Sequence, residues 1–121
     1  MKKILLVEDE KVLIDLYTTK FEIAGFKVIS AFETKTGLEL AKKEKPDLIV
    51  LDILLPRENG ISFLKQRQEN KEIAGIPVIA FSNYGDKETI QEAMKLGAQT
   101  YLIKANFTPS QIVEKIKKYL A

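Results

Sequence analysis

Five short apolar runs alternate along the chain with longer stretches in which apolar residues recur at helical spacing. Each run has four or five residues and most are rich in valine and isoleucine; they are Ile4–Val7, Lys27–Ala31, Leu48–Leu51, Pro77–Phe81 and Thr100–Ile103. Apolar runs of this length fit strands that are buried on both faces, as in a parallel sheet. Five strand–helix units in strict alternation therefore predict an α/β fold, a doubly wound parallel sheet with helices on both faces.

Capping residues mark where several of the predicted helices begin and end. The last helix has the clearest start, with Thr108 as N-cap, Pro109 at the first helical position and Gln111 completing a capping box. Asn59 and Asp86 are predicted to begin the third and fourth helices. The first helix is predicted to end at Gly25 and to bury one apolar stripe, made of Val12, Leu13, Leu16, Phe21 and Ala24.

Length and composition narrow the class of protein further. A chain of 121 residues allows one domain, predicted to span 1–121, and 45% hydrophobic with 30% charged residues is a globular composition. The net charge of +2 is too small to argue for nucleic acid. No apolar run approaches a membrane span and no signal peptide is evident, so we expect a cytoplasmic protein. The absence of cysteine and histidine excludes disulfides and histidine-based triads.

Polar side chains follow four of the five predicted strands. Glu8 and Asp9 come after the first strand, Asp52 after the third, Ser82 after the fourth and Lys104 after the fifth. Ligands of open parallel sheets bind outside the carboxyl ends of the strands. We therefore expect three carboxylates, a hydroxyl and an ammonium group to meet at one edge of the sheet.

Each of these residues also has an ordinary structural explanation, since acids often cap helices and serine often ends strands. Asp52 is the exception, because it begins in an apolar stretch where a lone charge is costly unless it is paired or bound to a cation. The turn after the first strand is acidic and lacks glycine, which argues against a phosphate cradle. Clustered carboxylates suit Mg²⁺ instead, and Mg²⁺ beside an aspartate and a lysine suits phosphoryl transfer.

At this point the chain resembles the receiver (CheY-like) domains of two-component response regulators, over essentially its whole length. The acidic pair Glu8-Asp9 ends the first apolar run, and Asp52 is followed by Pro56 and Gly60 at the family's offsets of four and eight. The stretches Pro77–Ser82 and Gly97–Lys104 and the capped last helix complete the resemblance. It implies a flavodoxin-like fold, with five helices around a five-stranded sheet of order 2-1-3-4-5.

The resemblance also implies a role for each polar residue. Asp52 looks like the phosphoacceptor, Ser82 like the hydroxyl that binds the phosphoryl group, and Lys104 like its ion-pair partner. The implied Mg²⁺ ligands are Asp9, Asp52 and the backbone carbonyl of Leu54, with Glu8 acting through water. Tyr101 looks like the rotating aromatic switch.

The implied function is a phosphorylation-dependent switch rather than an enzyme with independent turnover. A sensor histidine kinase or a histidine phosphotransfer protein would supply the phosphoryl group, and the surface of the fourth helix, fifth strand and fifth helix would control a downstream protein. Three alternatives stay open: an adaptor that is not phosphorylated, a haloacid-type phosphohydrolase, and a receiver cut from a longer regulator. The second lacks its usual Asp-x-Asp pair, because Asp52 is followed by Ile53 and Leu54.

Several residues depart from the family pattern. Glu8 is longer than the commoner aspartate, and Asn83 stands where a small residue is usual. Leu54 and Tyr84 occupy the two positions that tune dephosphorylation in the family, and their bulk predicts a longer-lived phosphorylated state. Ala105 replaces a proline after Lys104, and the cost of a cis bond before a residue other than proline favours a trans bond there.

Overall fold

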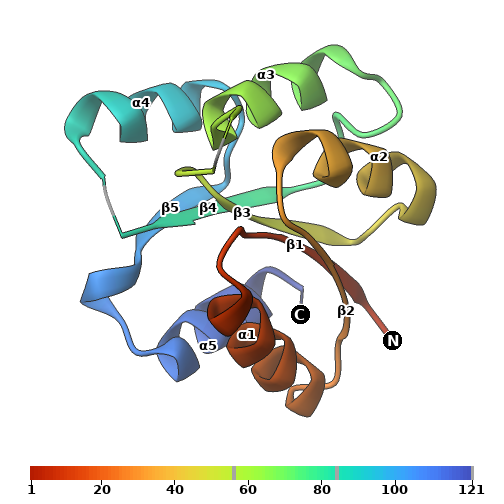
Figure 1. The fold of residues 1–121 in the computed structure, drawn as a ribbon, viewed down its shortest axis with the longest axis vertical. Helices are drawn as coiled ribbons and strands as arrows, with labels where there is room; N and C mark the ends of the chain where they lie inside the picture. The colour runs from red at the N-terminus through yellow and green to blue at the C-terminus, as the bar shows by residue number, and fades with distance from the viewer. Residues whose placement is uncertain (56, 84, 121) are drawn as a thin grey trace.

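A parallel sheet forms the middle layer of the structure, a computed structural model that describes residues 1–55, 57–83 and 85–120 (Figure 1). Its strands, in chain order, are β1 (Lys3–Val7), β2 (Lys27–Ala31), β3 (Leu48–Asp52), β4 (Val78–Ser82) and β5 (Thr100–Ile103). Across the sheet they lie in the order β2-β1-β3-β4-β5, and every neighbouring pair is parallel. The predicted fold class and strand order are confirmed.

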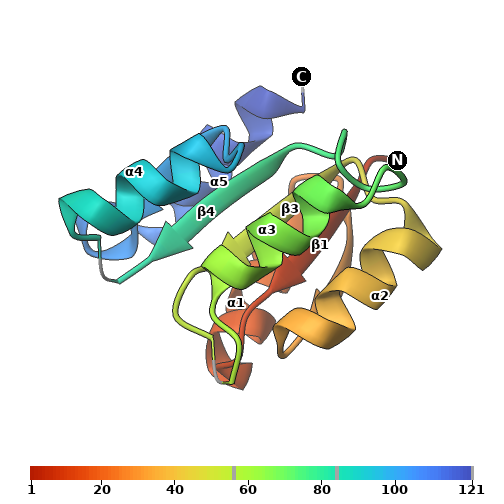
Figure 2. The same ribbon diagram turned by 90° about the horizontal axis from the view of Figure 1, so that it is seen from above.

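Helices cover both faces of this sheet. They are α1 (Lys11–Ile23), α2 (Thr34–Glu44), α3 (Gly60–Glu69), α4 (Lys87–Lys95) and α5 (Pro109–Tyr119), with a 3-10 helix, η1 (Lys104–Asn106), after β5. Helices α1 and α5 lie on one face, and α2, α3 and α4 lie on the other (Figures 1 and 2). None of the helices in the described part of the chain is long and apolar enough to cross a membrane.

The sheet separates two hydrophobic cores, because successive side chains of a strand point to opposite faces. On the central strand β3, Ile49 and Leu51 pack into the core beneath α2, α3 and α4, whereas Leu48 and Val50 pack into the core beneath α1 and α5. Every residue of β3 is buried, as its uninterrupted apolar sequence predicted. The carboxyl end of this doubly covered strand is Asp52.

The predicted helix caps are confirmed. The side chains of Asn59 and Asp86 accept hydrogen bonds from the backbone of the first turns of α3 and α4. Thr108 accepts from the Gln111 backbone at 3.1 Å, and the Gln111 side chain accepts from the Thr108 backbone at 2.8 Å, which is the complete capping box. These caps fix the starts of the helices that follow β3, β4 and β5.

The predicted stripe of α1 is partly wrong. Val12 is 77% exposed, and the buried residues of the helix are Ile14, Tyr17 and Phe21. The tyrosine ring decides the orientation, since it packs edge-on against Phe81 of β4 with 5.5 Å between ring centroids. A ring of this size contributes more buried area than a valine, so the helix turns Tyr17 inward and leaves Val12 in solvent.

Candidate functional site

Three acidic side chains meet at the carboxyl edge of the sheet. Val7 of β1 lies opposite Leu51 of β3, so Glu8, Asp9 and Asp52 leave two neighbouring strands at the same level. Each offers a carboxylate oxygen, and these oxygens all lie within 4.8 Å of one another. Glu8 and Asp52 are buried, whereas Asp9 is exposed. The structure therefore brings together the acids that the sequence placed at this edge.

Lys104 enters the same cluster from the end of β5. Its ammonium nitrogen lies 2.7 Å from Glu8 Oε1 and 3.0 Å from Asp52 Oδ2, and its side chain is 8% exposed. The same nitrogen lies over the ring of Phe81, 4.4 Å from the centroid. A lysine ammonium has three N–H donors. Two carboxylates and one aromatic face surround it here.

Burial and this lysine set the protonation of the two buried acids. Desolvation raises the pKa of Asp52 to about 7; Lys104 opposes the rise and the charge of Glu8 adds to it. Desolvation also acts on Glu8, but the hydrogen bond and the charge of Lys104 outweigh it and leave the pKa of Glu8 below its ordinary value. Glu8 keeps its charge because it accepts hydrogen bonds from both Lys104 and the N–H of Glu10. Burial would lower the pKa of Lys104, but the two carboxylates raise it.

The loop after β3 holds Asp52 in place. The backbone N–H of Leu54 donates to Asp52 Oδ1 at 2.9 Å, and the N–H of Gly60 donates to the carbonyl of Ile53 at 2.8 Å. A Cβ atom on Gly60 would lie 2.7 Å from Ile53 Cα and 2.9 Å from the Asp52 carbonyl oxygen, so only glycine allows this close approach. Pro56, between these residues, lies outside the described residues.

Ser82 and Tyr101 lie on the face of the sheet that α2, α3 and α4 cover. Ser82 is the buried last residue of β4, and Tyr101 of β5 is half-buried against the core beneath α2, α3 and α4. Burial raises the pKa of Tyr101, and a hydrogen bond with the Ser82 side chain lowers it in part. A rotating switch is expected to have a mobile or exposed ring before phosphorylation. Here the Tyr101 ring is partly buried, and the small Ala80 lies opposite it in β4.

Two of the departures from the family pattern, Leu54 and Asn83, are exposed residues that directly flank the site. The Leu54 side chain is 53% exposed and Asn83 is exposed, while Tyr84 lies outside the described residues. The predicted effect of Leu54 and Tyr84 on the phosphorylated lifetime stays a prediction. No peptide bond in the described residues is cis, so the trans bond predicted between Lys104 and Ala105 is confirmed. Both residues belong to η1, which directly follows β5.

Sequence reasoning missed Phe81 as a member of this site. It reads as one more apolar residue of β4. The signal was its place next to Ser82, since neighbouring strand residues face opposite sides and Phe81 must lie on the side from which Lys104 approaches. Phe81 and Leu102 are register partners and share the core beneath α1 and α5.

Comparison with known proteins identifies the family. The sequence model of the response regulator receiver domain family matches residues 4–117 of this chain. The chain belongs to this family. Receiver domains are phosphorylation-dependent signalling modules of two-component systems, not enzymes that turn over a substrate, so the phosphohydrolase alternative is set aside.

Curated relatives of this receiver agree. Alkaline phosphatase synthesis transcriptional regulatory protein PhoP of Bacillus subtilis is 34% identical over 119 residues, which are 98% of this chain and 48% of PhoP. Polar-differentiation response regulator DivK of Brucella anthropi is 34% identical over 122 residues, which are 98% of this chain and 96% of DivK. The receiver thus spans about half the length of one relative and nearly all of the other.

Solved structures show the same fold. A CheY-like receiver domain protein from Methanospirillum hungatei is 28% identical, with a TM-score of 0.90 over 99% of this chain and 94% of that one. The phosphorylated cyanobacterial phytochrome response regulator RcpA is 27% identical, with a TM-score of 0.83 over 98% of this chain and 92% of that one. The likeness extends over the whole sheet and all of its helices.

Proposed function

We propose that this receiver accepts a phosphoryl group on Asp52 from a phosphohistidine of a sensor histidine kinase or a histidine phosphotransfer protein, in the cytoplasm. One observation carries the proposal: Asp52 is a buried carboxylate within 3.0 Å of the Lys104 ammonium nitrogen, in a cluster with Asp9. The similar RcpA, whose structure is that of a phosphorylated protein, supports it. The donor histidine must come from the partner, because this chain has none.

The nucleophile in this reaction is the ionised form of Asp52. With a pKa of about 7, an appreciable fraction of Asp52 is protonated at neutral pH. A cation near the carboxylate favours the ionised form. Lys104 supplies one positive charge, and its ammonium group can also balance the charge that accumulates on the phosphoryl oxygens.

We propose Mg²⁺ as the second cation. Asp9, Asp52 and the backbone carbonyl of Leu54 would hold it, since Mg²⁺ prefers oxygen ligands and is commonly bound by one or two carboxylates. Asp9 and Asp52 belong to a cluster of carboxylates whose oxygens lie within 4.8 Å of one another, and this spacing fits such an ion. When bound, Mg²⁺ neutralises charge on the transferred phosphoryl group.

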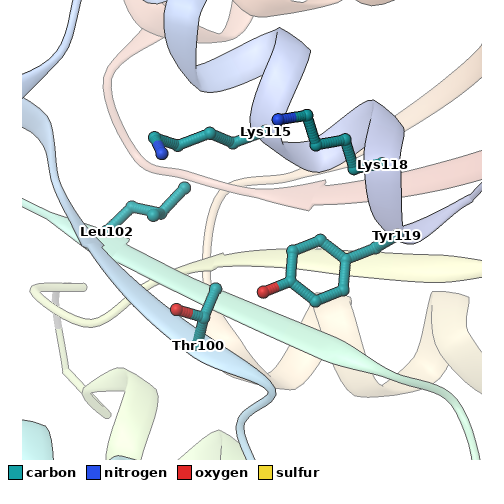
Figure 3. A pocket seen from close by; sticks show the side chains of 5 residues that line it. All are labelled: Thr100, Leu102, Lys115, Lys118 and Tyr119. Carbon is teal, nitrogen blue, oxygen red and sulfur yellow. The ribbon is translucent and has the colours of Figure 1, made fainter.

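The change would reach a downstream protein through Ser82 and Tyr101. A phosphoryl group on Asp52 would draw the Ser82 hydroxyl toward it and change its hydrogen bond with Tyr101. Tyr101 belongs to β5, the edge strand between α4 and α5. A hollow of about 290 Å³ opens between β5 and α5. Figure 3 shows the residues that line it, which are Thr100, Leu102, Lys115, Lys118 and Tyr119. We propose the surface of α4, β5 and α5 as the one that a partner recognises.

Small phosphodonors test the assignment directly. Incubation with acetyl phosphate or phosphoramidate and Mg²⁺ should add one phosphoryl mass to the wild type and none to Asp52→Asn. Asp15→Asn is the matched control, because Asp15 is an exposed aspartate of α1 whose substitution should leave labelling intact. Equal labelling of Asp52→Asn would remove Asp52 as the acceptor. A wild type that takes up no phosphoryl group would favour the adaptor alternative.

A further inference from the structure

Glu8 and Phe81 hold Lys104 on the side of the site that faces α1 and α5. We propose that Glu8 is the positioning residue of Lys104 and not a ligand of the metal, and that Glu8 and Phe81 together form a clamp that competes with the phosphoryl group for this lysine. The contacts of Glu8 and Phe81 with Lys104 are given by the geometry alone. Its consequence for phosphorylation rests on the function proposed for Asp52.

The Glu8 carboxylate is fixed toward Lys104 by the backbone around it. Glu8 has no exposed surface, and its N–H donates to the carbonyl of Ala31 in the strand β2 at 3.0 Å. Its Oε2 accepts the N–H of Glu10 at 3.1 Å, and its Oε1 accepts Lys104 at 2.7 Å. Both oxygens therefore have donors, as both oxygens of Asp52 do, but Glu8 differs from Asp52 in having no exposed surface and the shorter contact with Lys104. Asp9, the adjacent acid, is exposed and remains accessible to an ion from solvent.

The length of the glutamate side chain makes this contact short. An aspartate at this position would withdraw the carboxylate by about 1.5 Å, the length of one carbon–carbon bond. The present separation of 2.7 Å is that of a strong charge-assisted hydrogen bond. Glu8 consequently lies closer to Lys104 than Asp52 does, at 3.0 Å.

Phe81 is the second part of the clamp, and its ring lies beneath the ammonium group of Lys104. Its ring is fully buried, and Tyr17 packs edge-on against it at 5.5 Å, which fixes the plane of the ring. The negative face of an aromatic ring attracts an ammonium group, and the attraction grows when water is excluded. Lys104 therefore has a buried carboxylate beside it and a fixed aromatic face beneath it.

The clamp opposes phosphorylation in two ways. A phosphoryl group on Asp52 needs the positive charge of Lys104, but Glu8 keeps a share of that charge. The negative charge of Glu8 also repels the phosphoryl oxygens across the same buried site, where screening by water is weak. Removal of the Glu8 charge should therefore strengthen binding of a phosphoryl group or its mimic.

Beryllofluoride, a mimic of the phosphoryl group, measures this competition. At saturating Mg²⁺, Glu8→Gln should bind beryllofluoride about tenfold more tightly than the wild type, the scale of one charge-assisted hydrogen bond. Asp9→Asn is the matched control, since it removes one negative charge from the same cluster without touching Lys104. It should lose Mg²⁺ affinity and bind beryllofluoride more weakly.

The ¹⁵Nζ resonance of Lys104 tests the clamp without metal or phosphodonor. In the wild type the ammonium protons of Lys104 should exchange slowly with water, unlike those of Lys11, which pairs with Asp15 on the surface. Glu8→Gln and Glu8→Asp should both speed this exchange, the first by loss of charge and the second by loss of reach. Phe81→Leu should shift the resonance by removing the ring current, and it keeps the test available if a Glu8 variant does not fold.

The opposite pattern would overturn the proposal. If Glu8→Gln weakened Mg²⁺ binding as strongly as Asp9→Asn and left the Lys104 resonance unchanged, Glu8 would be a metal ligand and no clamp would exist. Failure of Asp52 to accept a phosphoryl group would contradict the proposed function instead. It would leave the resonance of Lys104 as it is, so the two failures are distinguishable.

Discussion

Asp52→Asn should stabilise the metal-free protein, and the gain should grow as the pH rises. An asparagine resembles the protonated aspartate in shape and charge, and its single side-chain oxygen can still accept from one of the two donors, the Leu54 N–H at Oδ1 or the Lys104 ammonium group at Oδ2. The ionised wild-type carboxylate bears the cost of burial and of repulsion by Glu8, which together lift its pKa above the value of an exposed carboxyl. The substitution removes both costs.

The pKa of Asp52 gives the magnitude. A carboxyl whose pKa rises from 3.8 to about 7 on folding costs the folded state about 4 kcal/mol once both states are ionised. Between these two pKa values the folded chain holds a proton that the unfolded chain has lost. Stability therefore falls as the pH rises through this window, by about 3 kcal/mol between about pH 5 and about pH 8. For a domain of this size that is a drop of about 12 °C in Tm.

Urea and thermal unfolding in EDTA, followed by circular dichroism, measure the effect. The wild-type free energy of unfolding should decline from pH 5 to pH 8, and the difference between Asp52→Asn and wild type should widen with it. Asp9, whose pKa is raised by burial and then by Glu8, is present in both proteins, so its titration contributes to both curves. Asp15→Asn, at an exposed position, should run parallel to the wild type. Parallel curves for Asp52→Asn and wild type would refute the reasoning.

Two further perturbations have defined outcomes. Mg²⁺ at ten times its dissociation constant should add about 1.4 kcal/mol to the stability of the wild type by mass action, and clearly less to Asp52→Asn; equal gains in melting experiments would place the ion elsewhere. Gly60→Ala should lower the free energy of unfolding by about 1–3 kcal/mol, because the added Cβ would press on the backbone of Ile53 and Asp52. Gly75→Ala is the control and should lower it little, because there is open space around Gly75. Equal unfolding free energies for the two variants would contradict the role of Gly60.

The elements of the fold were predictable because each is encoded locally. Continuous apolar runs indicate strands that are covered on both faces, and the caps at Asn59, Asp86 and Thr108 depend on residues within one helical turn. The convergence of Glu8, Asp52 and Lys104 also followed, since it requires only that each residue ends a parallel strand.

The contacts between separate elements were not predictable in this way. The stripe of α1 was misassigned because Tyr17 packs on Phe81, a residue of a strand far along the chain. The buried Arg67 of α3 gives no signal in the sequence either; its guanidinium donates to the carbonyl of Ile76 at 3.0 and 2.8 Å, which ties α3 to the segment before β4. Such partners are fixed by tertiary packing and not by spacing.

The two hydrophobic cores on either side of the sheet have a consequence for how this chain can diversify. A single layer of backbone separates them, and substitutions without shared neighbours add independently. Side chains beneath α2, α3 and α4 can therefore drift without compensation beneath α1 and α5. At the carboxyl edge this independence ends, because residues from both faces meet in one polar site, where Phe81 lies under Lys104 and Ser82 forms a hydrogen bond with Tyr101. Substitutions at Phe81 and Ser82 are therefore expected to be coupled.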